Sequence, residues 1–367
     1  MKEINIASVL VNKRKEKGIT QDELASYMGV SKASVSKWET GQSYPDVTFL
    51  PQLAAYFNIS IDDLMDYKPQ MTKEDIRKLY RRLSADFAAK PFDTVIEDCD
   101  QIIRKYYSCF PLLLQIGMLI VNHLELANDP SKAEALLAQS KALFSRVREE
   151  SGDVSLTKQA LFMEAMCCLM TNDPGTALEL LDGAIVPAMP PESLLASAYQ
   201  MTGRVEEAKE VLQIGMYQNI VVLFNFLPPY LMLCANDTKK FEEALRRGLI
   251  VAEAFDMKHL HPAVIIGIYL SAAQGYCMQQ NHERALDMLE EYAGIVTGNI
   301  YPLRLQGDSF FDQLNSWLEQ LDLGTGLPRD AKTIKKSMLG VVESPVFSAL
   351  AQEERYHALL ERLKSSL

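Results

Sequence analysis

The sequence predicts an all-α protein in which a small five-helix domain precedes a long array of helix pairs. Three observations predict this. Valine and isoleucine recur at helical rather than alternating spacing, and almost no segment has the alternation of a half-buried strand. Turn signals recur at intervals of about one helix length. Short alanine-centred stretches also repeat between residues 129 and 290, as expected of a helical array.

The composition is that of an ordinary globular protein. Of its 367 residues, 48% are hydrophobic and 23% are charged, which excludes a disordered or collagen-like chain. At about 150 residues per domain, the length predicts two or three domains. The 37 basic and 48 acidic residues leave a net charge of −11. An acidic chain does not coat nucleic acid or anionic membrane nonspecifically, so any contact with DNA must be local.

The cysteines and the charge pattern indicate a cytoplasmic protein. The six cysteines form no CxxC pair, which is typical of reduced thiols in a core. Seven charged residues fall within the first seventeen positions and leave no room for a secretory apolar stretch. The apolar run at 220–235 is interrupted by Asn225 and by Pro228-Pro229, so we expect no membrane span.

A short linker near residue 68 divides the chain. Residues 67–70 read Tyr-Lys-Pro-Gln, and Thr72 is a cap-like start for the next helix. Residues 1–68 hold 8 basic and 9 acidic groups, so the remaining 29 basic and 39 acidic groups give a net charge of −10. We therefore predict one domain at 1–68 and a second, strongly acidic domain at 69–367.

Caps and turns predict the helices of the first domain. Thr20 and Glu23 form a capping box that begins the second helix. Gly29 ends that helix, since glycine adopts the positive φ of such a turn most easily. Ser31 caps the third helix. The five helices are expected at about 6–17, 20–29 and 31–40, after Asp46, and after Ser60.

Residues 21–39 have the spacing of a helix-turn-helix. Ala25 is small where the two helices touch, Gly29 lies in the turn, and Val35 lies on the inner face of the second helix. The stretch resembles the Cro/C1-type helix-turn-helix family, which it matches over 21–25, 29–31 and 35–41, with Pro45 and Leu53 at family positions. The resemblance covers about the first 65 residues and implies a five-helix, lambda-repressor-like DNA-binding domain. Some members of the family use this fold only for protein contacts.

In that fold the third helix lies in the major groove with its N-terminal residues at base edges. Lysine can bond guanine O6 and N7, serine can bond either kind of base edge, and alanine can touch a thymine methyl group. The residues expected at base edges are Lys32, Ala33, Ser34 and Lys37. Lys37 also fits an exposed lysine that only aids solubility.

The resemblance implies two further roles in the first domain. Gln21 and Ser36 match family positions that contact phosphates, and Arg14 and Glu39 match a structural ion pair between the first and third helices. Because the domain is not strongly basic, one copy is expected to bind DNA weakly. A homodimer that reads two half-sites about one helical turn apart restores affinity.

The second domain shows self-similar stretches centred on alanines at 133, 177, 208, 244 and 285, which lie 44, 31, 36 and 41 residues apart. Such spacing indicates a helical-repeat array. One unit resembles a tetratricopeptide repeat at Leu195, Ala196, Tyr199, Gly203, Ala208, Leu212 and Gly215. No single unit buries its apolar side alone, so a stacked superhelix is expected. A plain helical array without true repeats is the alternative.

The tetratricopeptide resemblance implies a concave groove lined by the first helix of each pair. In that register the groove residues are Gln159, Phe162, Met166, Ser193, Ser197, Gln200, Phe226, Leu233, Asn236, Gln274 and Met278. Amide side chains can bond the backbone of an extended peptide, while methionine and phenylalanine accept its side chains. Methionine and phenylalanine at helical spacing also fit an ordinary core.

No residues combine into a catalytic, metal or cofactor site. His259 and His261 point apart on a helix, and no cysteine or carboxylate lies beside them at ligand spacing. Gly324 and Gly326 lack the strand and helix that frame a phosphate-binding loop. An enzyme is therefore the least favoured function, and no cofactor is expected.

A Cro/C1-type domain followed by a helical-repeat domain is similar to the RRNPP group of peptide-sensing regulators in Gram-positive bacteria. This resemblance is architectural and covers the whole chain. It implies a homodimeric transcription factor that binds a double-stranded DNA operator and a short signal peptide, without a membrane partner. A groove that holds a protein partner or a small molecule remains the alternative.

Overall fold

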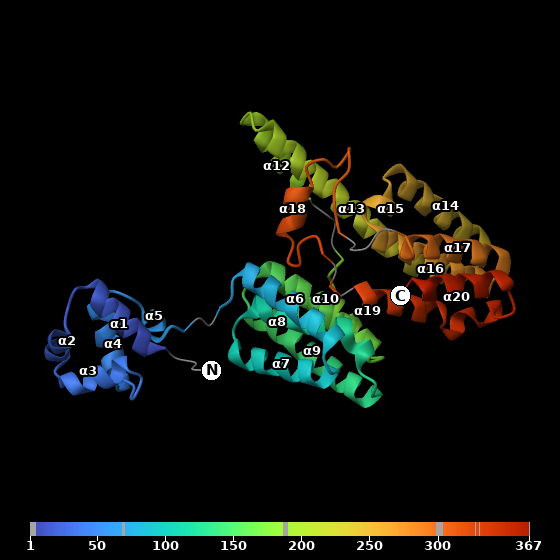
Figure 1. Ribbon diagram of the computed structural model, residues 1–367. Helices are drawn as coiled ribbons and strands as arrows, with labels where there is room; N and C mark the ends of the chain where they lie inside the picture. The colour runs from blue at the N-terminus through green and yellow to red at the C-terminus, as the bar shows by residue number, and fades with distance from the viewer. Residues whose placement is uncertain are drawn as a thin grey trace. The chain divides into compact units, whose positions relative to one another are not determined.

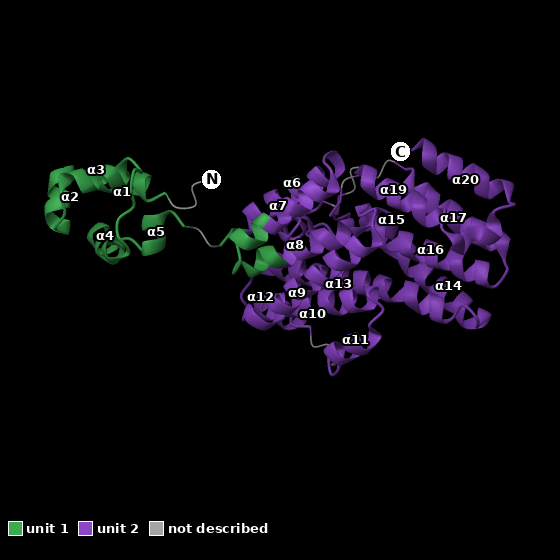
Figure 2. Ribbon diagram, turned by 90° about the horizontal axis from the view of Figure 1, so that it is seen from below, with its two compact units in different colours: residues 1–72, 101–113 green, residues 73–100, 114–367 purple. Residues whose placement is uncertain are grey.

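The computed structural model describes residues 5–67, 70–185, 190–298, 304–326, 328–329 and 331–366. Over these residues helix is the sole regular secondary structure, which confirms the all-α prediction (Figure 1). The chain divides into two compact units, residues 1–72 with 101–113 and residues 73–100 with 114–367 (Figure 2). Lys68 and Pro69 of the expected linker lie outside the described residues.

Residues 5–67 of the first unit contain five short α-helices near the expected positions. They are α1 (Ile6–Glu16), α2 (Gln21–Met28), α3 (Lys32–Glu39), α4 (Leu50–Phe57) and α5 (Ile61–Met65), with a 3-10 helix at Val47–Phe49. The capping box forms: the Thr20 hydroxyl accepts from the Glu23 amide, and Glu23 accepts from the Thr20 amide at 2.7 Å. Gly29 has a φ of +67°. The core between these helices buries Leu10, Leu24, Val35, Leu53 and Leu64.

The chain from residue 73 onward is also built of helices. They are α6 (Lys73–Ala89), α7 (Phe92–Lys105), α8 (Phe110–His123), α9 (Pro130–Glu150), α10 (Val154–Met170), α11 (Pro174–Leu181), α12 (Glu192–Met201), α13 (Val205–Leu233), α14 (Thr238–Ala254), α15 (Met257–Leu260), α16 (Pro262–Met278), α17 (His282–Val296), α18 (Asn315–Gln320), α19 (Ala331–Val342) and α20 (Glu354–Ser365). Two 3-10 helices lie at Leu124–Leu126 and Pro345–Leu350. Neighbours in sequence pack as pairs, most extensively α9 with α10, α12 with α13, and α16 with α17.

Local sequence explains where several of these helices begin. Asp129 and Asp173 accept hydrogen bonds from the amides of Ser131 and Thr176, and each is followed by proline at the first helical position. An aspartate cap satisfies amides that have no partner within the helix, and proline has no amide to satisfy there. The repeated Asp-Pro signal therefore begins α9 and α11 for the same physical reason.

Small residues lie where paired helices meet. A Cβ atom added to Gly215 of α13 would lie 3.3 Å from Cβ of Glu192 in α12. A Cβ atom on Gly275 of α16 would lie 2.3 Å from the ring of Phe241 in α14. Phe241 belongs to the large core of the second unit, together with Phe224 and Tyr276. Glycine at these positions thus sets how closely the helices approach.

The interrupted apolar run lies within one long helix. The run at 220–235 contains Asn225 and Pro228-Pro229, and α13 is continuous through all three over 29 residues. Packing compensates for the missing amide donors, because Phe224 and Leu231 are fully buried and Pro228 faces Gly267 of α16. Among the described residues, α13 is long and apolar enough to cross a membrane by length and composition alone.

Candidate nucleic-acid interface

The α2 and α3 helices form the frame of the candidate interface. The inner face of α3 carries Val35 and Trp38, which are buried in one core with Leu24 and Ala25 of α2. The Trp38 ring also lies 5.7 Å from the ring of Phe49. Burial of this face directs the opposite face of α3 toward solvent. A short helix held in this way presents a rigid surface to a ligand.

The residues predicted at base edges lie on this outward part of α3. Lys32, Ala33 and Lys37 are exposed, and Ser34 is half-buried. Ala33 and Lys37 are four residues apart and therefore share one face of the helix. The Ser34 hydroxyl lies 2.9 Å from that of Ser31, and the Ser34 amide donates to the Ser31 hydroxyl. Ser34 thus takes part in the cap of α3 in the free chain.

An acidic residue that the sequence did not single out neutralises Lys32. The Lys32 ammonium lies 2.7 Å from a carboxylate oxygen of Asp22 on α2, and both side chains are exposed. Exposed ion pairs contribute little stability, so Lys32 can leave Asp22 at low cost to bond a base. Asp22 lies on α2 and Lys32 on α3, so the ion pair could not be predicted from the periodicity of either helix.

Arg14 and Glu39 form a bidentate ion pair between α1 and α3. Arg14 Nε and Nη2 donate to the two carboxylate oxygens of Glu39 at 2.6 and 2.9 Å. The Glu39 side chain is 4% exposed and that of Arg14 15%. Burial by itself raises the pKa of Glu39, but hydrogen bonds from Arg14 and Gln21 outweigh burial and lower that pKa. The pair therefore fixes α3 to α1.

The structure gives Gln21 a second partner besides the predicted phosphate. Gln21 is half-buried and its side-chain nitrogen donates to Glu39 at 2.8 Å. The amide nitrogen carries two hydrogens, so one of them is left for a phosphate oxygen. Ser36, the other predicted phosphate contact, is half-buried on α3. Both phosphate contacts stay predictions.

The residues predicted to line the groove are all described, and none of them is buried. Met166 and Gln274 are half-buried, and the other nine side chains are exposed. They lie on α10, α12, α13 and α16, with Asn236 directly after α13. The eleven side chains are therefore accessible to a ligand rather than part of the core.

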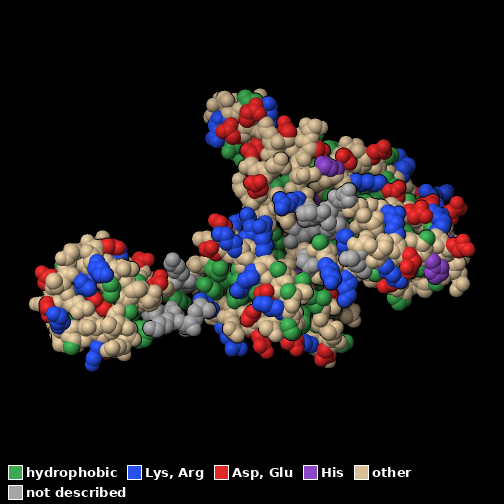
Figure 3. Space-filling model, in the orientation of Figure 1, with side chains coloured by type: hydrophobic (Ala, Val, Ile, Leu, Met, Phe, Trp, Pro, Cys, Tyr) green, Lys and Arg blue, Asp and Glu red, His purple; other side chains and the backbone are tan. Residues whose placement is uncertain are grey.

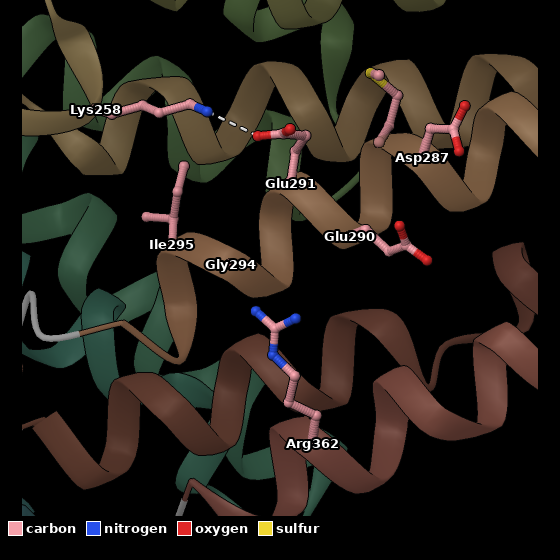
Figure 4. A pocket seen from close by; sticks show the side chains of 8 residues that line it. Lys258, Asp287, Glu290, Glu291, Gly294, Ile295 and Arg362 are labelled. Carbon is pink, nitrogen blue, oxygen red and sulfur yellow. Dashed lines mark hydrogen bonds and ion pairs between the residues drawn. The ribbon is translucent and has the colours of Figure 1, made fainter.

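Two cavities lie among other residues. The first, of about 590 Å³, is lined from α15, α17 and α20 (Figure 4). Its charged groups pair with protein groups: Lys258 contacts Glu291 at 2.7 Å, and Arg355 contacts Asp287 and Glu290. The second cavity, of about 670 Å³, lies between α14 and α17. Neither lining includes a predicted groove residue.

The histidines do not mark a metal site within the described part of the chain. His259 Nε2 lies 3.1 Å from the Gln306 amide nitrogen, and burial lowers the pKa of His261. Across the residues that the structure describes, no three histidine, cysteine, aspartate or glutamate side chains are placed to hold a metal ion. All six cysteines are free, and five of them are buried.

Comparison with known proteins identifies the first domain. A helix-turn-helix family model matches residues 10–64. The HTH-type transcriptional activator BcrR of Enterococcus faecalis is 32% identical over 73 residues, which are 18% of this chain and 36% of that protein. The chain thus matches about a third of the length of this relative.

Two solved structures align at low identity. They are the apo form of the competence regulator ComR from Streptococcus vestibularis, and Bacillus thuringiensis PlcR in complex with the peptide PapR7 and DNA. Identity is 13% for ComR, over 88% of this chain and 99% of that chain, and 12% for PlcR, over 98% of each chain. TM-scores of 0.24 and 0.25 carry no argument about what the second unit binds. The identification therefore concerns the first unit: residues 10–64 form a helix-turn-helix domain of the Cro/C1 type.

Proposed function

We propose that the protein is a cytoplasmic, sequence-specific DNA-binding transcriptional regulator. The observation that carries this proposal is the rigid presentation of α3. Its inner face is buried, its start is capped by Ser31, and its end is tied to α1 through Glu39. Lys32, Ala33 and Lys37 are exposed and would face base edges in a major groove, with Ser34 beside them and Lys32 exchanging Asp22 for a base. Gln21 and Ser36 would hold the flanking phosphates.

We further propose that the second domain is a tetratricopeptide-like array that binds a short signal peptide and forms a homodimer. The exposure of the Gln159, Gln200 and Asn236 amides and of the Phe162 ring supports peptide binding. Amides suit a peptide backbone and the apolar groups suit its side chains. If the peptide changes operator affinity, DNA must change peptide affinity by the same factor.

The DNA assignment is tested by substituting the recognition residues. Lys32→Ala is expected to weaken binding by about 1–3 kcal/mol, or about 5- to 150-fold, and to relax base preference. Gln21→Ala is expected to weaken binding evenly across sequences. Affinity is measured by fluorescence anisotropy on the duplex that the wild-type chain selects from a randomised library, and on scrambled duplexes.

Lys32→Arg is the matched control, since arginine also bonds guanine O6 and N7 and keeps most of the affinity. Equal losses on every duplex in Lys32→Ala would make Lys32 a phosphate contact. Unchanged affinity in both alanine variants would contradict the placement of α3 in the groove.

The peptide and dimer assignments are tested together by native mass spectrometry of the purified chain. We expect twice the chain mass with added mass in the range of a short peptide. Denaturation should release the added mass, because no covalent bond is proposed. A dimer without added mass, even after incubation with a peptide extract of the source culture, would contradict peptide binding. A monomer would contradict the dimer.

A further inference from the structure

The α13 helix has two distinct apolar faces. One face carries Tyr217, Phe224 and Leu231, which are seven residues apart and buried in the large core of the second unit. The second face points away from that core and is exposed. We call it the α13 seam, and its members are Leu212, Met216, Asn219, Leu223, Phe226, Tyr230 and Leu233. Near its N-terminal end this second face also meets α12, since Gly215 packs against Glu192. The stretch from Leu223 to Leu233 lies beyond that contact and is exposed, which the fold of one copy does not require.

The spacing of the seam is that of a helix-packing surface. Its members alternate at intervals of four and three residues, as do the core positions of a coiled coil. The seam spans 22 residues of helix, or about 33 Å at 1.5 Å per residue. Phe226 is 65% exposed and Leu233 86%. A contiguous exposed apolar stripe of this length marks an interaction site rather than scattered surface residues.

The charge distribution indicates which partner fits. The sequence from Val211 to Asn236 contains no aspartate, glutamate, lysine or arginine. The domain that carries it has a net charge of −10, so two copies repel one another wherever acidic residues face each other. Figure 3 shows charged side chains at the tip formed by α12 and the start of α13. The uncharged seam is a surface on which two copies can meet without like-charge contacts.

We propose that the α13 seam is the homodimer interface and packs against the α13 seam of a second copy about a two-fold axis. In such an interface the same surface is used by both copies and must complement itself, which an uncharged 4-3 stripe does. Asn219 is the polar member, and a polar residue within such a stripe sets the register of packing. The inference rests on the proposed function, which requires a dimer, and adds where that dimer forms.

The proposal also reassigns two residues. Phe226 and Leu233 belong to both the seam and the predicted groove. In the dimer they contact the second copy, which leaves the groove residues on α10, α12 and α16 for a peptide. The peptide and the second copy therefore occupy different surfaces of the array.

Charged substitutions in the seam test the proposal. Leu223→Glu and Phe226→Glu place a carboxylate in the interface of each copy and are expected to raise the dimer dissociation constant roughly 100-fold or more. Met201→Glu on α12 is the control, because Met201 is 88% exposed and lies outside the seam. Sedimentation velocity on the full chain reports the oligomeric state, and far-UV circular dichroism reports the fold. Both seam residues are exposed in one copy, so folding should be unchanged.

The expected result is a dimeric wild type, a dimeric Met201→Glu and two folded, monomeric seam variants. Dimers in both seam variants beside a dimeric wild type would overturn the α13 interface and leave the proposed dimer intact. Loss of the dimer in Met201→Glu as well would overturn the specific role of the seam. A monomeric wild type would overturn both the interface and the dimer. It would not decide DNA binding, which the affinity of Lys32→Ala for the operator tests independently.

Discussion

Arg14→Ala is expected to destabilise the helix-turn-helix domain by about 3 kcal/mol, a large part of the stability of a domain this small. The substitution leaves Glu39, which is 4% exposed, as a carboxylate that keeps the hydrogen bond from Gln21 but has lost its counter-ion. A buried charge without its counter-ion costs more than the intact pair contributes. Because Glu39 lies at the end of α3, we expect operator binding to fall with the folded fraction.

The measurement is urea unfolding of the full chain, followed by fluorescence of Trp38 in a Trp317→Phe background, since the chain has two tryptophans. Removing both charges in Arg14→Met with Glu39→Leu should recover most of the loss, because an apolar pair leaves no charge unpaired. A double variant less stable than Arg14→Ala would contradict this account.

The pH dependence of the same pair has a defined sign. The pKa of Glu39 is lowered in the folded domain, so its contribution is present above the unfolded value and is lost as pH falls through the folded pKa. The stability difference between wild type and Arg14→Ala should therefore narrow in acid below about pH 4.5. A difference that stays constant through this range would contradict the assignment to an ionised Glu39.

Gly275→Ala is expected to destabilise the second domain by about 1–3 kcal/mol. The new methyl group would lie 2.3 and 2.5 Å from two ring carbons of Phe241, well inside van der Waals contact. Phe241 is fully buried and packs edge-on against Tyr276, so its ring has no free space to enter. Either α16 moves away from α14 or the ring leaves its preferred rotamer.

The matched control is Gly340→Ala in α19, where no atom lies within 4 Å of the added methyl group. Alanine is a better helix former than glycine by about 1 kcal/mol, so this substitution should stabilise or leave stability unchanged. Thermal unfolding followed by circular dichroism at 222 nm compares the two variants. If Gly275→Ala and Gly340→Ala changed the melting temperature equally and in the same direction, the clash with Phe241 would be contradicted.

The sequence was most informative where structure depends on neighbouring residues. The capping box at Thr20, the turn at Gly29 and the caps at Ser31, Asp46 and Ser60 each involve residues at most four positions apart. Such contacts can be predicted from local sequence, because both partners lie within one turn of the chain. This is why the five helices of the first domain, and the outward residues of α3, could be predicted closely.

The course of α13 was decided by tertiary packing. Two adjacent prolines disfavour a continuous helix by local rules, but Phe224 and Leu231 on the same helix are fully buried in the core of the second unit. The burial of these side chains, at roughly 1.5–3 kcal/mol each, opposes the loss of backbone hydrogen bonds. Local sequence contains no measure of that burial.

The all-α class, the helix-turn-helix and the repeated helix starts were therefore determined by the sequence itself, because local hydrogen bonds and apolar periodicity specify them. The pairing of Lys32 with Asp22, the bond from Gln21 to Glu39 and the exposure of Leu223 on α13 were decided only by the tertiary structure. Each depends on which distant side chains the fold brings together, or leaves uncovered, and the periodicity of one helix does not record this.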